Sequence, residues 1–454
     1  MKRATLIIPV ENQVRELDAK LLLSAAAAER GYPVVIGSRA FVHFAASRLP
    51  RGVYMAKSMR TLSDRMFGIL RRLGHEIIGF DEEGLVRLPD EEYYRRRLSA
   101  KALRMVSQLL AWGPDDARAF RAFPGTPDIP IHITGNPRVD IMRAELRAYL
   151  EPEVEAIRKH RGGFVLINSN FSEVNHFLPG MSDTLQLAEG SSLAGETEYM
   201  KGRARYRVEI YRDFQRMLPE LARRFPELHF VLRPHPSESH DSWRALAADS
   251  PNLEVINEGS VAPWVLASSV VISNGCTTAV EARILERPAI GYKLREDPAY
   301  DHPITDDVAH VARSLGELEA LVASAARDEL GVRDDEASRS RLAEHVAAID
   351  GAFAADRIVD VLDAAGHADG PPPRASAGRF ARGWIANQVR TAQKRINMHR
   401  PGHRNHWSYH HHRFPEVGAE ELQARIGRMG RALGRYDGIR VERMGRYLFR
   451  VGRA

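Results

Sequence analysis

The sequence is poor in cysteine and contains no long apolar run. Cys276 is the single cysteine among 454 residues, so an intramolecular disulfide and a zinc site built on several thiolates are both excluded. No apolar stretch approaches the roughly 18 residues that a membrane-spanning helix needs. The N-terminal residues also lack the small-residue cleavage site of a secretory signal. We therefore expect a cytoplasmic protein.

Two common nucleotide-binding motifs are also absent. No G-x-G-x-x-G motif follows the first apolar run, and no G-x-x-x-x-G-K-S/T motif occurs in the chain. These absences argue against dinucleotide oxidoreductases and P-loop enzymes. The remaining composition, 44% hydrophobic and 27% charged, is that of a globular chain with enough residues for two large domains.

Acidic residues are scarce near the C-terminal end. Residues 371–454 contain 18 Lys plus Arg and 5 Asp plus Glu, a net charge of 18 − 5 = +13, whereas the whole chain carries +6. We therefore expect a proline-rich linker over residues 366–380 and a basic extension over residues 381–454. Such an extension suits the anionic inner surface of a membrane, which we expect as a partner.

The same extension contains aromatic residues that could stack on the bases of an RNA. They are Trp384, Trp407, Tyr409, Phe414 and Tyr436. No sequence signature of an RNA-binding fold accompanies them, so nucleic acid is not an expected partner. A solvated, arginine-rich tail without a partner is the simpler alternative.

Apolar runs of strand length alternate twice with amphipathic helical stretches. The first series starts at residues 4–10 and occupies residues 1–155, and the second starts at residues 164–168 and occupies residues 163–365. This alternation is typical of a parallel sheet with helices on both faces. We expect an α/β protein with two doubly wound, Rossmann-like domains. In such sheets the ligand binds at the carboxyl ends of the strands.

The segment Arg233-Pro234-His235-Pro236 follows directly after an apolar strand, at the end where ligands bind. The two prolines restrict the backbone around His235 and thereby fix the direction of its imidazole. A fixed histidine beside the Arg233 guanidinium suits hydrogen bonding to a nucleotide phosphate or ribose. The alternative is a loop histidine that caps backbone groups. Arg233, His235 and Pro236 are therefore nucleotide-binding candidates.

Residues 273–278, Ser-Asn-Gly-Cys-Thr-Thr, lie between an apolar strand and a helix. Small hydroxyl and glycine residues at a helix start leave N–H groups that attract an anion. Simple capping of the helix is the alternative. The nucleotide-binding candidates in this turn are Ser273, Asn274, Gly275, Thr277 and Thr278.

Three carboxylates in a row, Asp81-Glu82-Glu83, precede Gly84 at the end of an apolar strand. Adjacent carboxylates repel one another, so we expect at least one of them to have a raised pKa. A carboxyl group with a raised pKa is suited to act as a general base near neutral pH. The alternative is a solvated acidic turn. Asp81, Glu82 and Glu83 are therefore catalytic candidates.

Further polar residues follow strand-like runs and are expected to line a substrate cleft. They are Glu11, Asn136, Arg138, Asn168, Asn170 and Ser172. Cys276 has no identifiable partner for nucleophilic catalysis, and no metal site is expected.

In chain order, Glu82-Glu83-Gly84 and His235-Pro236 resemble the D/E-D/E-G and HP motifs of bacterial sialyltransferases and related transferases with the two-domain GT-B fold. The 273–278 turn resembles their hydroxyl motif, although Ser273-Asn274-Gly275 stands in place of an adjacent serine pair. More broadly, residues 1–365 resemble the bacterial surface carbohydrate biosynthesis proteins, which are related to the Kdo transferases. The segments that carry this resemblance are Pro9-Val10-Glu11, residues 81–84, residues 135–140 (Gly-Asn-Pro-Arg-Val-Asp) and residues 168–175.

The resemblance implies a GT-B fold whose domains face across a cleft, and a donor that is a CMP-activated nonulosonic acid or Kdo. It implies that His235 contacts the CMP phosphate and that Ser273, Thr277 and Thr278 hold the leaving group. Glu83 matches the catalytic carboxylate, which acts as a base in inverting relatives and is proposed as a nucleophile in retaining ones. The acceptor would be a glycan, a lipid-linked glycan or a protein, and no cofactor is expected.

Three other functions remain open. A polyol-phosphate transferase of the teichoic-acid type resembles the chain through residues 233–236 and the later Ser/Thr turn. It would bind CDP-glycerol or CDP-ribitol, with a histidine base in the region where this chain has an acidic loop. The second is a nucleotide-sugar 2-epimerase of the same fold. The third is a non-enzymatic RNA- or membrane-binding protein.

Overall fold

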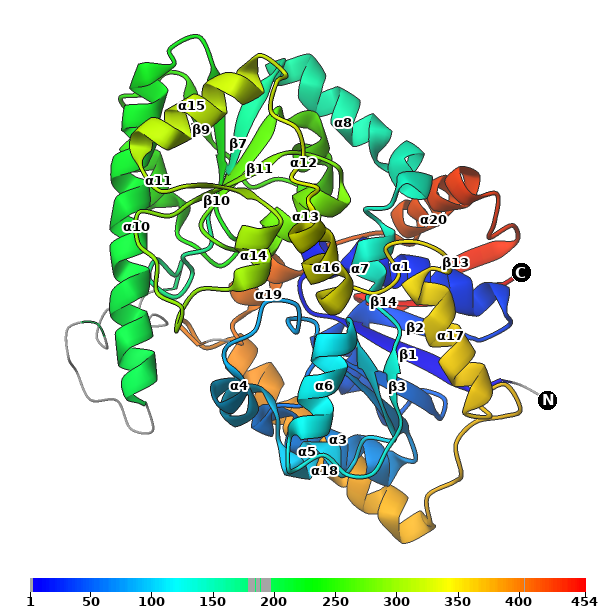
Figure 1. Ribbon diagram of the computed structural model, residues 1–454. Coiled ribbons are helices and arrows are strands. Elements are labelled where there is room, and N and C mark those ends of the chain that lie inside the picture. The colour runs from blue at the N-terminus through cyan, green and yellow to red at the C-terminus, as the bar shows by residue number, and fades with distance from the viewer. Residues whose placement is uncertain (1–2, 179–183, 185–187, 189–196, 404) are drawn as a thin grey trace. The chain divides into compact units, whose positions relative to one another are not determined.

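The computed structural model describes residues 3–178, 184, 188, 197–403 and 405–454, and the chain forms two compact units (Figure 1). The first unit consists of Met1–Tyr149 together with Ala343–Ala454, and the second of Leu150–Leu342. Each unit has its own sheet of parallel strands with helices beside it. The predicted α/β class with two parallel-sheet domains is therefore confirmed.

The first unit contains an eight-stranded sheet in the order β13-β14-β2-β1-β3-β4-β5-β6. Strands β1 to β6 are parallel to one another. Their order in the sheet is 2-1-3-4-5-6, so the direction in which the chain adds strands reverses between β1 and β3. The strands are β1 (Thr5–Val10), β2 (Val34–Ser38), β3 (Gly52–Ala56), β4 (Glu76–Phe80), β5 (Gln108–Ala111), β6 (Ile131–Ile133), β13 (Ile439–Gly445) and β14 (Leu448–Arg453).

The helices of the first unit follow the strands, and α1 is buried along most of its length because its sequence is almost entirely apolar from Leu21 to Ala28. Gly74 ends α3 with φ +88°, a left-handed conformation that glycine adopts without strain. The helices are α1 (Gln13–Glu29), α2 (Arg39–Ala45), α3 (Asp64–Leu73), α4 (Asp90–Arg97), α5 (Ala100–Leu103), α6 (Pro114–Ala122), α7 (Pro137–Asp140), α17 (Ala354–Ala364), α18 (Ala377–Met398), α19 (Trp407–Arg413) and α20 (Ala419–Leu433), with short 3₁₀ turns at Thr61–Ser63 and Ala144–Leu146.

The second unit contains a six-stranded parallel sheet in the order β12-β11-β10-β7-β8-β9. Counted from β7, this is the order 3-2-1-4-5-6 of dinucleotide-binding folds, and its direction reverses between β7 and β10. The strands are β7 (Phe164–Asn168), β8 (His229–Arg233), β9 (Leu253–Val255), β10 (Val270–Ser273), β11 (Ala289–Tyr292) and β12 (His310–Ala312).

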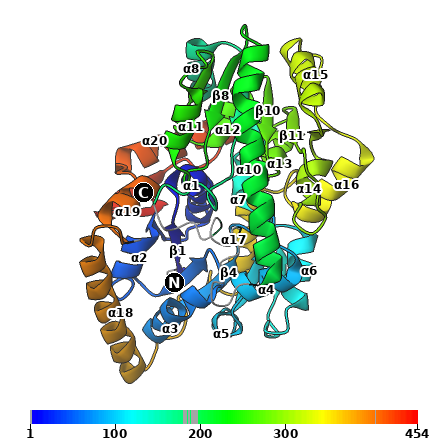
Figure 2. The ribbon, with the colours of Figure 1, turned by 90° about the vertical axis from the view of Figure 1, so that its left-hand side faces the viewer.

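The long helix α10 (Glu198–Arg224) lies along one face of this second sheet, and Figure 2 shows it in front of the strands. Its apolar side enters the core through Phe214 and Leu218, which are buried with Trp243. The other helices are α11 (His240–Ala247), α12 (Val261–Ala267), α13 (Thr277–Ile284), α14 (Pro303–Asp307) and α15 (Leu315–Ala326). The sequence boundaries of the units fall within α8 (Arg147–Arg161) and α16 (Glu336–His345).

The C-terminal part of the chain differs from the expected division into a linker and a basic extension. Strand β14 pairs antiparallel with β2, with Val451 opposite Val34, and therefore completes the first sheet. Residues 343–365, expected in the second domain, also belong to the first unit. Helix α17 begins at Ala354, and the backbone N–H groups of Ala354 and Ala355 donate to the carboxylate of Asp140 in α7. The expected extension rested on the net charge of this segment and took no account of the apolar residues that alternate along it.

No helix within the described residues is both long and apolar enough to cross a membrane.

Because β14 is an integral strand, we expect a substitution in it to destabilise the first unit. Phe449 is 1% exposed, and truncation to Ala is expected to cost about 3–5 kcal/mol in the free energy of unfolding. The neighbouring Arg450 is exposed, so Arg450→Ala is the matched control and is expected to change stability by less than about 0.5 kcal/mol. Urea unfolding of the full chain measures both. Equal stability of the two variants would contradict an integral role for β14.

Candidate functional site

Strands β7, β8 and β10 of the second unit end at residues that lie opposite one another in the sheet. Asn168, the last residue of β7, pairs with Arg233 of β8 on one side and with Ser273 of β10 on the other. The parallel register therefore brings the predicted segments at 168–172, 233–236 and 273–278 together at the carboxyl end of the sheet. This is the point where the strand order reverses, the usual ligand position in such sheets.

Glu238 connects two of these loops and was not predicted. Its buried carboxylate accepts hydrogen bonds from Ser169 Oγ, from the backbone N–H groups of Phe171 and His235, and from Trp243 Nε1, at 2.8–3.1 Å. Burial raises the pKa of Glu238, while these donors oppose the rise. Its position three residues after His235, in a loop that follows a strand, is the only sequence signal that pointed to it.

The imidazole of His235 forms a hydrogen bond within its own loop. The backbone N–H of Ser237 donates to His235 Nδ1 at 3.2 Å, so the proton of the neutral ring lies on Nε2. The half-buried ring is thus a hydrogen-bond donor, which suits a phosphate or hydroxyl oxygen. The alternative was a histidine that caps backbone groups, and His235 Nδ1 does accept from the backbone N–H of Ser237.

Arg233 is placed differently from the expectation. Its Nη atoms donate to the carbonyls of Glu258 at 2.6 Å and Gly259 at 3.1 Å, and its guanidinium lies 4.7 Å from the centre of the Trp264 ring. Burial lowers the pKa of Arg233 to about 9. Because these contacts occupy the guanidinium, Arg233 fixes the loop after β9 rather than supplying positive charge to a phosphate.

The turn at 273–278 contains buried polar atoms without a described partner. Gly275 has φ +74°, the left-handed conformation that lets the chain turn sharply into α13. Ser273 Oγ and both side-chain polar atoms of Asn274 are buried and form no hydrogen bond within the described residues. A buried polar atom without a partner costs about 1–3 kcal/mol, and a ligand or water can supply the missing partner.

The two threonines of the turn differ in their surroundings. Thr278 Oγ1 accepts weak hydrogen bonds from Asn168 Nδ2 at 3.4 Å and Cys276 Sγ at 3.3 Å. Thr277 is half-buried at the first position of α13. Of the hydroxyls predicted to hold an anion, Thr278 is therefore engaged by neighbouring side chains, and Ser273 and Thr277 are better placed for a ligand.

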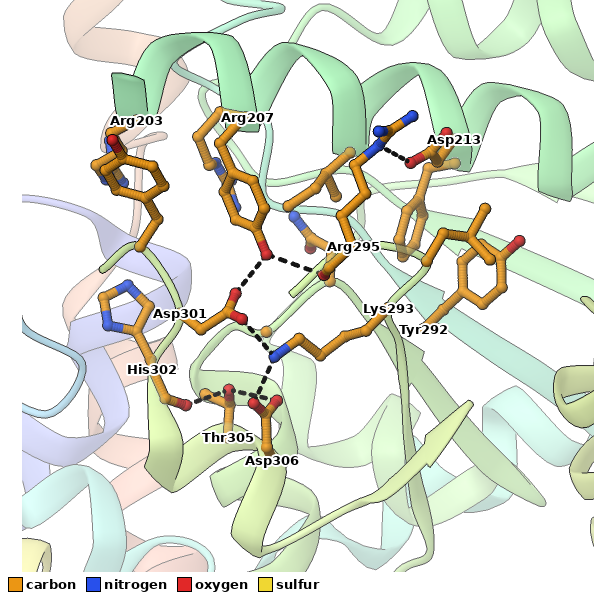
Figure 3. Close-up of a pocket in the computed structure, with 17 residues that line it drawn as sticks. Arg203, Arg207, Asp213, Tyr292, Lys293, Arg295, Asp301, His302, Thr305 and Asp306 are labelled. Carbon is orange, nitrogen blue, oxygen red and sulfur yellow. Dashed lines mark hydrogen bonds and ion pairs between the residues drawn. The ribbon is translucent and has the colours of Figure 1, made fainter. Parts of the chain in front are cut away.

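A pocket opens beside this turn, and Figure 3 shows the side chains around it. Asn274 and Gly275 line it from the turn, and the rest of the lining comes from α10 and from the segment that runs from β11 to α14. The other lining residues are Arg203, Tyr206, Arg207, Ile210, Asp213, Phe214, Tyr292, Lys293, Leu294, Arg295, Tyr300, Asp301, His302, Thr305 and Asp306. Ser172 and Asn170 lie in the loop after β7, and the carbonyl of Asn170 accepts a hydrogen bond from Arg207 Nη2.

Arg207 is the cation of this pocket that has no carboxylate partner in the described part of the chain. Its guanidinium lies 5.3 Å from the centre of the Phe171 ring, and burial lowers its pKa. Lys293, in contrast, contacts Asp301 at 2.8 Å and Asp306 at 2.6 Å. A buried guanidinium without an ion pair favours an anionic ligand. Arg207 was not predicted, because it lies on α10 and far in sequence from the strand ends.

The three adjacent carboxylates of the first unit lie in different environments. Asp81 is 1% exposed and accepts hydrogen bonds from Tyr93 Oη at 3.0 Å and Arg97 Nε at 3.2 Å. Trp112 Nε1 donates to the Asp81 carbonyl at 2.7 Å. These contacts use Asp81 to hold the loop in place.

Glu82 lines a pocket at the carboxyl ends of β1, β3 and β4. It contacts Lys20 Nζ at 3.1 Å and accepts from Asn136 Nδ2 at 3.3 Å, and the predicted Arg138 lines the same pocket. Lys20 also contacts Glu16 at 2.7 Å. The structure thus brings the predicted residues Glu82, Asn136 and Arg138 together. The pair Glu16 and Lys20 was not predicted, although two charges four residues apart in an apolar helix were a visible signal.

Glu83 is the exposed member of the acidic loop, with 53% of its side chain accessible, and Arg97 Nη1 lies 2.9 Å from Oε2. At least one of the three carboxyls was expected to have a raised pKa, and Glu83 is not that one. Desolvation would raise its pKa, but Arg97, Arg15 and Lys57 outweigh that effect and lower it. Glu83 is therefore ionised at neutral pH.

Glu11 follows β1 and is surrounded by cations. Its carboxylate contacts Lys57 Nζ at 2.7 Å, Arg39 Nη1 at 3.1 Å and Arg413 Nη1 at 2.7 Å. Desolvation opposes ionisation, yet these cations hold the pKa of Glu11 well below its ordinary value. The predicted cleft residue Glu11 is consequently a fixed anion that ties β1, α2, the end of β3 and α19 together.

Asp116, next to Gly84, is a carboxyl group of the first unit with a raised pKa, as is Asp140. A Cβ added at Gly84 would lie 3.1 Å from Asp116 Oδ1, and Trp112 N–H donates to Oδ2 at 3.1 Å. Burial raises the pKa of Asp116 from 3.8 to about 8. Asp116 is therefore protonated in the folded state at neutral pH.

This protonation makes stability depend on pH in a defined direction. Between pH values near 3.8 and 8 the folded state holds a proton at Asp116 that the unfolded state releases. Stability therefore falls with rising pH, by up to about 1.4 kcal/mol per pH unit from this group. Asp116→Asn is expected to remove this slope. The free energy of unfolding of the variant minus that of the parent, measured by urea unfolding, should therefore be more positive at pH 8 than at pH 5.

Asp115 supplies the matched control. Its pKa is lowered, because hydrogen bonds with His345 and Arg118 and the charge of Arg87 outweigh the desolvation that would raise it. Its contribution to stability is present above its ordinary pKa and is lost at lower pH, so Asp115→Asn is expected to destabilise the protein at neutral pH. An unchanged pH slope in Asp116→Asn would contradict the assignment.

Comparisons with known proteins address the fold. No protein-family model matches the chain, and no curated protein matches it either. The chain is similar to a structure described as a UDP-N-acetylglucosamine 2-epimerase from Listeria monocytogenes, with 13% identity and a TM-score of 0.50 over 83% of this chain and 100% of that one. The wall teichoic acid polymerase TagF (12% identity, TM-score 0.47, 79% of this chain and 88% of that one) and the UDP-GlcNAc 2-epimerase of Neisseria meningitidis (11%, 0.46, 79% and 100%) also match. At such identities the similarity concerns the fold alone: the chain has the two-domain α/β fold of the GT-B type.

Proposed function

We propose that the protein is a glycosyltransferase that uses a nucleotide-activated sugar, with the donor nucleotide bound by the second unit. The observation that carries the proposal is the buried group of Ser273 Oγ and the Asn274 amide, without hydrogen-bond partners among the described residues. This group lies at the strand-order reversal beside the pocket that contains Arg207.

The chemistry of these groups suits a departing nucleotide phosphate. Ser273 Oγ and Asn274 Nδ2 can donate to phosphate oxygens, Arg207 supplies a buried positive charge, and His235 can donate through Nε2. Donors fixed before the reaction stabilise the charge that develops on the leaving phosphate, because they need no reorganisation. The start of α13 adds the positive end of a helix dipole at Thr277.

The proposed donor is a CMP-activated acidic keto-sugar, and the proposed acceptor is a surface glycan or glycoconjugate. The resemblance of the acidic loop and of the HP segment supports this choice. An acidic keto-sugar carries a carboxylate in addition to the phosphate, and a pocket with a buried unpaired guanidinium suits such an anion-rich donor.

Glu83 is the proposed reacting carboxylate because it is the accessible one of the three. As a base it takes the proton of the acceptor hydroxyl while the acceptor oxygen bonds to the anomeric carbon and the bond from that carbon to the CMP phosphate oxygen breaks. As a nucleophile it forms a bond to the anomeric carbon while the bond from that carbon to the CMP phosphate oxygen breaks. The acceptor oxygen then displaces Glu83 from the same carbon, and the acceptor proton passes to the released CMP phosphate. Both roles need the ionised form, which Arg97 and the neighbouring cations maintain.

The nucleotide is identified by binding measurements. We expect the protein to bind CMP in preference to CDP and UDP in calorimetric titrations. Removing one hydrogen bond to a charged group costs about 1.5–3 kcal/mol, so Ser273→Ala and Asn274→Ala should each weaken CMP binding by roughly 10- to 100-fold. Ser250→Ala, in the loop that precedes β9 at the opposite end of the sheet, is the control and should bind normally. A clear preference for CDP-glycerol would favour the polyol-phosphate transferase instead, and a preference for UDP-sugars the epimerase.

The reacting carboxylate is identified by turnover. Glu83→Gln is expected to lower CMP release from a CMP-keto-sugar by roughly 10²- to 10⁴-fold, the usual contribution of a general base, with donor affinity unchanged. Glu91→Gln, an exposed substitution on α4, is the control. If Glu82→Gln lost turnover while Glu83→Gln kept it, the assignment of the reacting group to Glu83 would be wrong.

A further inference from the structure

Helix α18 presents apolar side chains to solvent and polar ones to the protein. Gly383, Asn387 and Thr391 are its buried residues in the middle of the helix. Ile385, Val389 and Ile396 lie on the opposite side and are 55%, 57% and 57% exposed. This polarity is the reverse of that of a surface helix whose apolar stripe faces the core.

The buried side of α18 is fixed on the first unit, so the helix cannot rotate its apolar side inward. A Cβ added at Gly383 would lie 2.8 Å from Arg72 Cβ, which means that α18 approaches the end of α3 as closely as glycine allows. Asn387 Nδ2 donates to Ser47 Oγ at 3.3 Å, just after α2. Figures 1 and 2 both show α18 alongside α3 at the outside of the first unit.

The exposed side of α18 is also strongly cationic. The helix carries Arg379, Arg382, Arg390, Lys394 and Arg395, and no Asp or Glu occurs between Asp369 and Glu416. Three of these cations, Arg379, Arg382 and Arg395, are exposed and form no ion pair with a described residue, although the Arg395 guanidinium lies 5.7 Å from the centre of the Phe44 ring of α2. Trp384, 46% exposed, lies beside Ile385. We call Trp384, Ile385, Val389 and Ile396 with these three arginines the outer face of α18.

We propose that the outer face of α18 docks on an anionic lipid bilayer. An amphipathic helix that lies in the membrane interface combines apolar and tryptophan side chains with lysine and arginine, which matches this composition. Each basic side chain near an anionic surface contributes about a fivefold change in affinity. The proposal is independent of the proposed enzymatic function, because it rests on residues outside both pockets.

Two other occupants fit the outer face less well. A second copy of the chain, related by a two-fold axis, would bring Arg379, Arg382 and Arg395 against the same arginines without an acidic residue of the helix to pair with them. An RNA would satisfy the arginines but would leave Val389 and Ile396 without an apolar partner. A bilayer satisfies both the charges and the aliphatic side chains.

The test is co-sedimentation of the full-length protein with vesicles. We expect binding to vesicles of phosphatidylcholine with phosphatidylglycerol, weaker binding at high salt, and little binding to phosphatidylcholine alone. The double variant Ile385→Glu/Val389→Glu and the triple variant Arg379→Ala/Arg382→Ala/Arg395→Ala are each expected to lower the partition coefficient roughly a hundredfold.

Matched controls separate docking from general effects of charge and hydrophobicity. Met444→Glu changes another exposed apolar residue of the first unit, and Arg216→Ala/Arg223→Ala/Arg327→Ala removes three exposed arginines of the second unit. Both controls should bind vesicles as the parent does, and all variants should keep the parent's circular dichroism and thermal midpoint.

The proposal is overturned by any of three results. The parent protein shows no preference for anionic vesicles, or the controls lose as much binding as the variants of α18. Light scattering shows a dimer that Ile385→Glu/Val389→Glu dissociates in the absence of lipid. Fluorescence anisotropy shows that a single-stranded RNA, and not the vesicles, binds in a way that depends on the outer face.

Discussion

The parallel register of β7 against β8 and β10 is the constraint on which the candidate site of the second unit depends. It places Arg233, Asn168 and Ser273 in one row, although more than a hundred residues separate the first and last of these strands. A shift of one residue in β7 would turn its side chains to the other face of the sheet. The buried carboxylate of Glu238 accepts hydrogen bonds from the loops after β7 and β8. It therefore holds these two loops next to each other beyond the ends of the strands.

In the first unit, ion pairs position the candidate site residues, whereas in the second unit strand register positions them. At least one of the three adjacent carboxyls was expected to have a raised pKa. Each of them contacts a cation, Arg97 for Asp81 and Glu83 and Lys20 for Glu82, and the pKa of Glu83 is lowered. Attraction at about 3 Å outweighs repulsion between neighbours in sequence whose side chains point in different directions. The pKa of Asp116 is raised because this carboxyl is buried and no cation among the described residues forms a hydrogen bond with it.

The sequence was sufficient to predict the alternating strands and helices and the candidate residues at strand ends, because both follow from local patterns of apolar residues. Glu82, Asn136 and Arg138 were predicted separately and meet in one pocket. Arg207 and Lys293 could not be predicted in this way. Arg207 lies on a helix whose distance from the strand ends is set by packing, and whether an arginine is paired with a carboxylate depends on contacts that no local pattern encodes.

The C-terminal segment was misjudged because net charge was used as a guide to its structure. An exposed strand edge invites association with other chains, and β14 covers the edge of β2 that would otherwise be open. Its arginines therefore had structural positions to fill: Arg413 reaches Glu11, and Arg435 bridges Glu29 and Asp356. The exposed arginines of α18 differ from these paired ones, because they form no ion pair with a described residue and lie beside an apolar stripe. A segment that only needed to close a sheet would not place isoleucine and valine on its outer side; their position there, opposite a glycine and an asparagine that face the protein, is explained when an apolar medium covers that side.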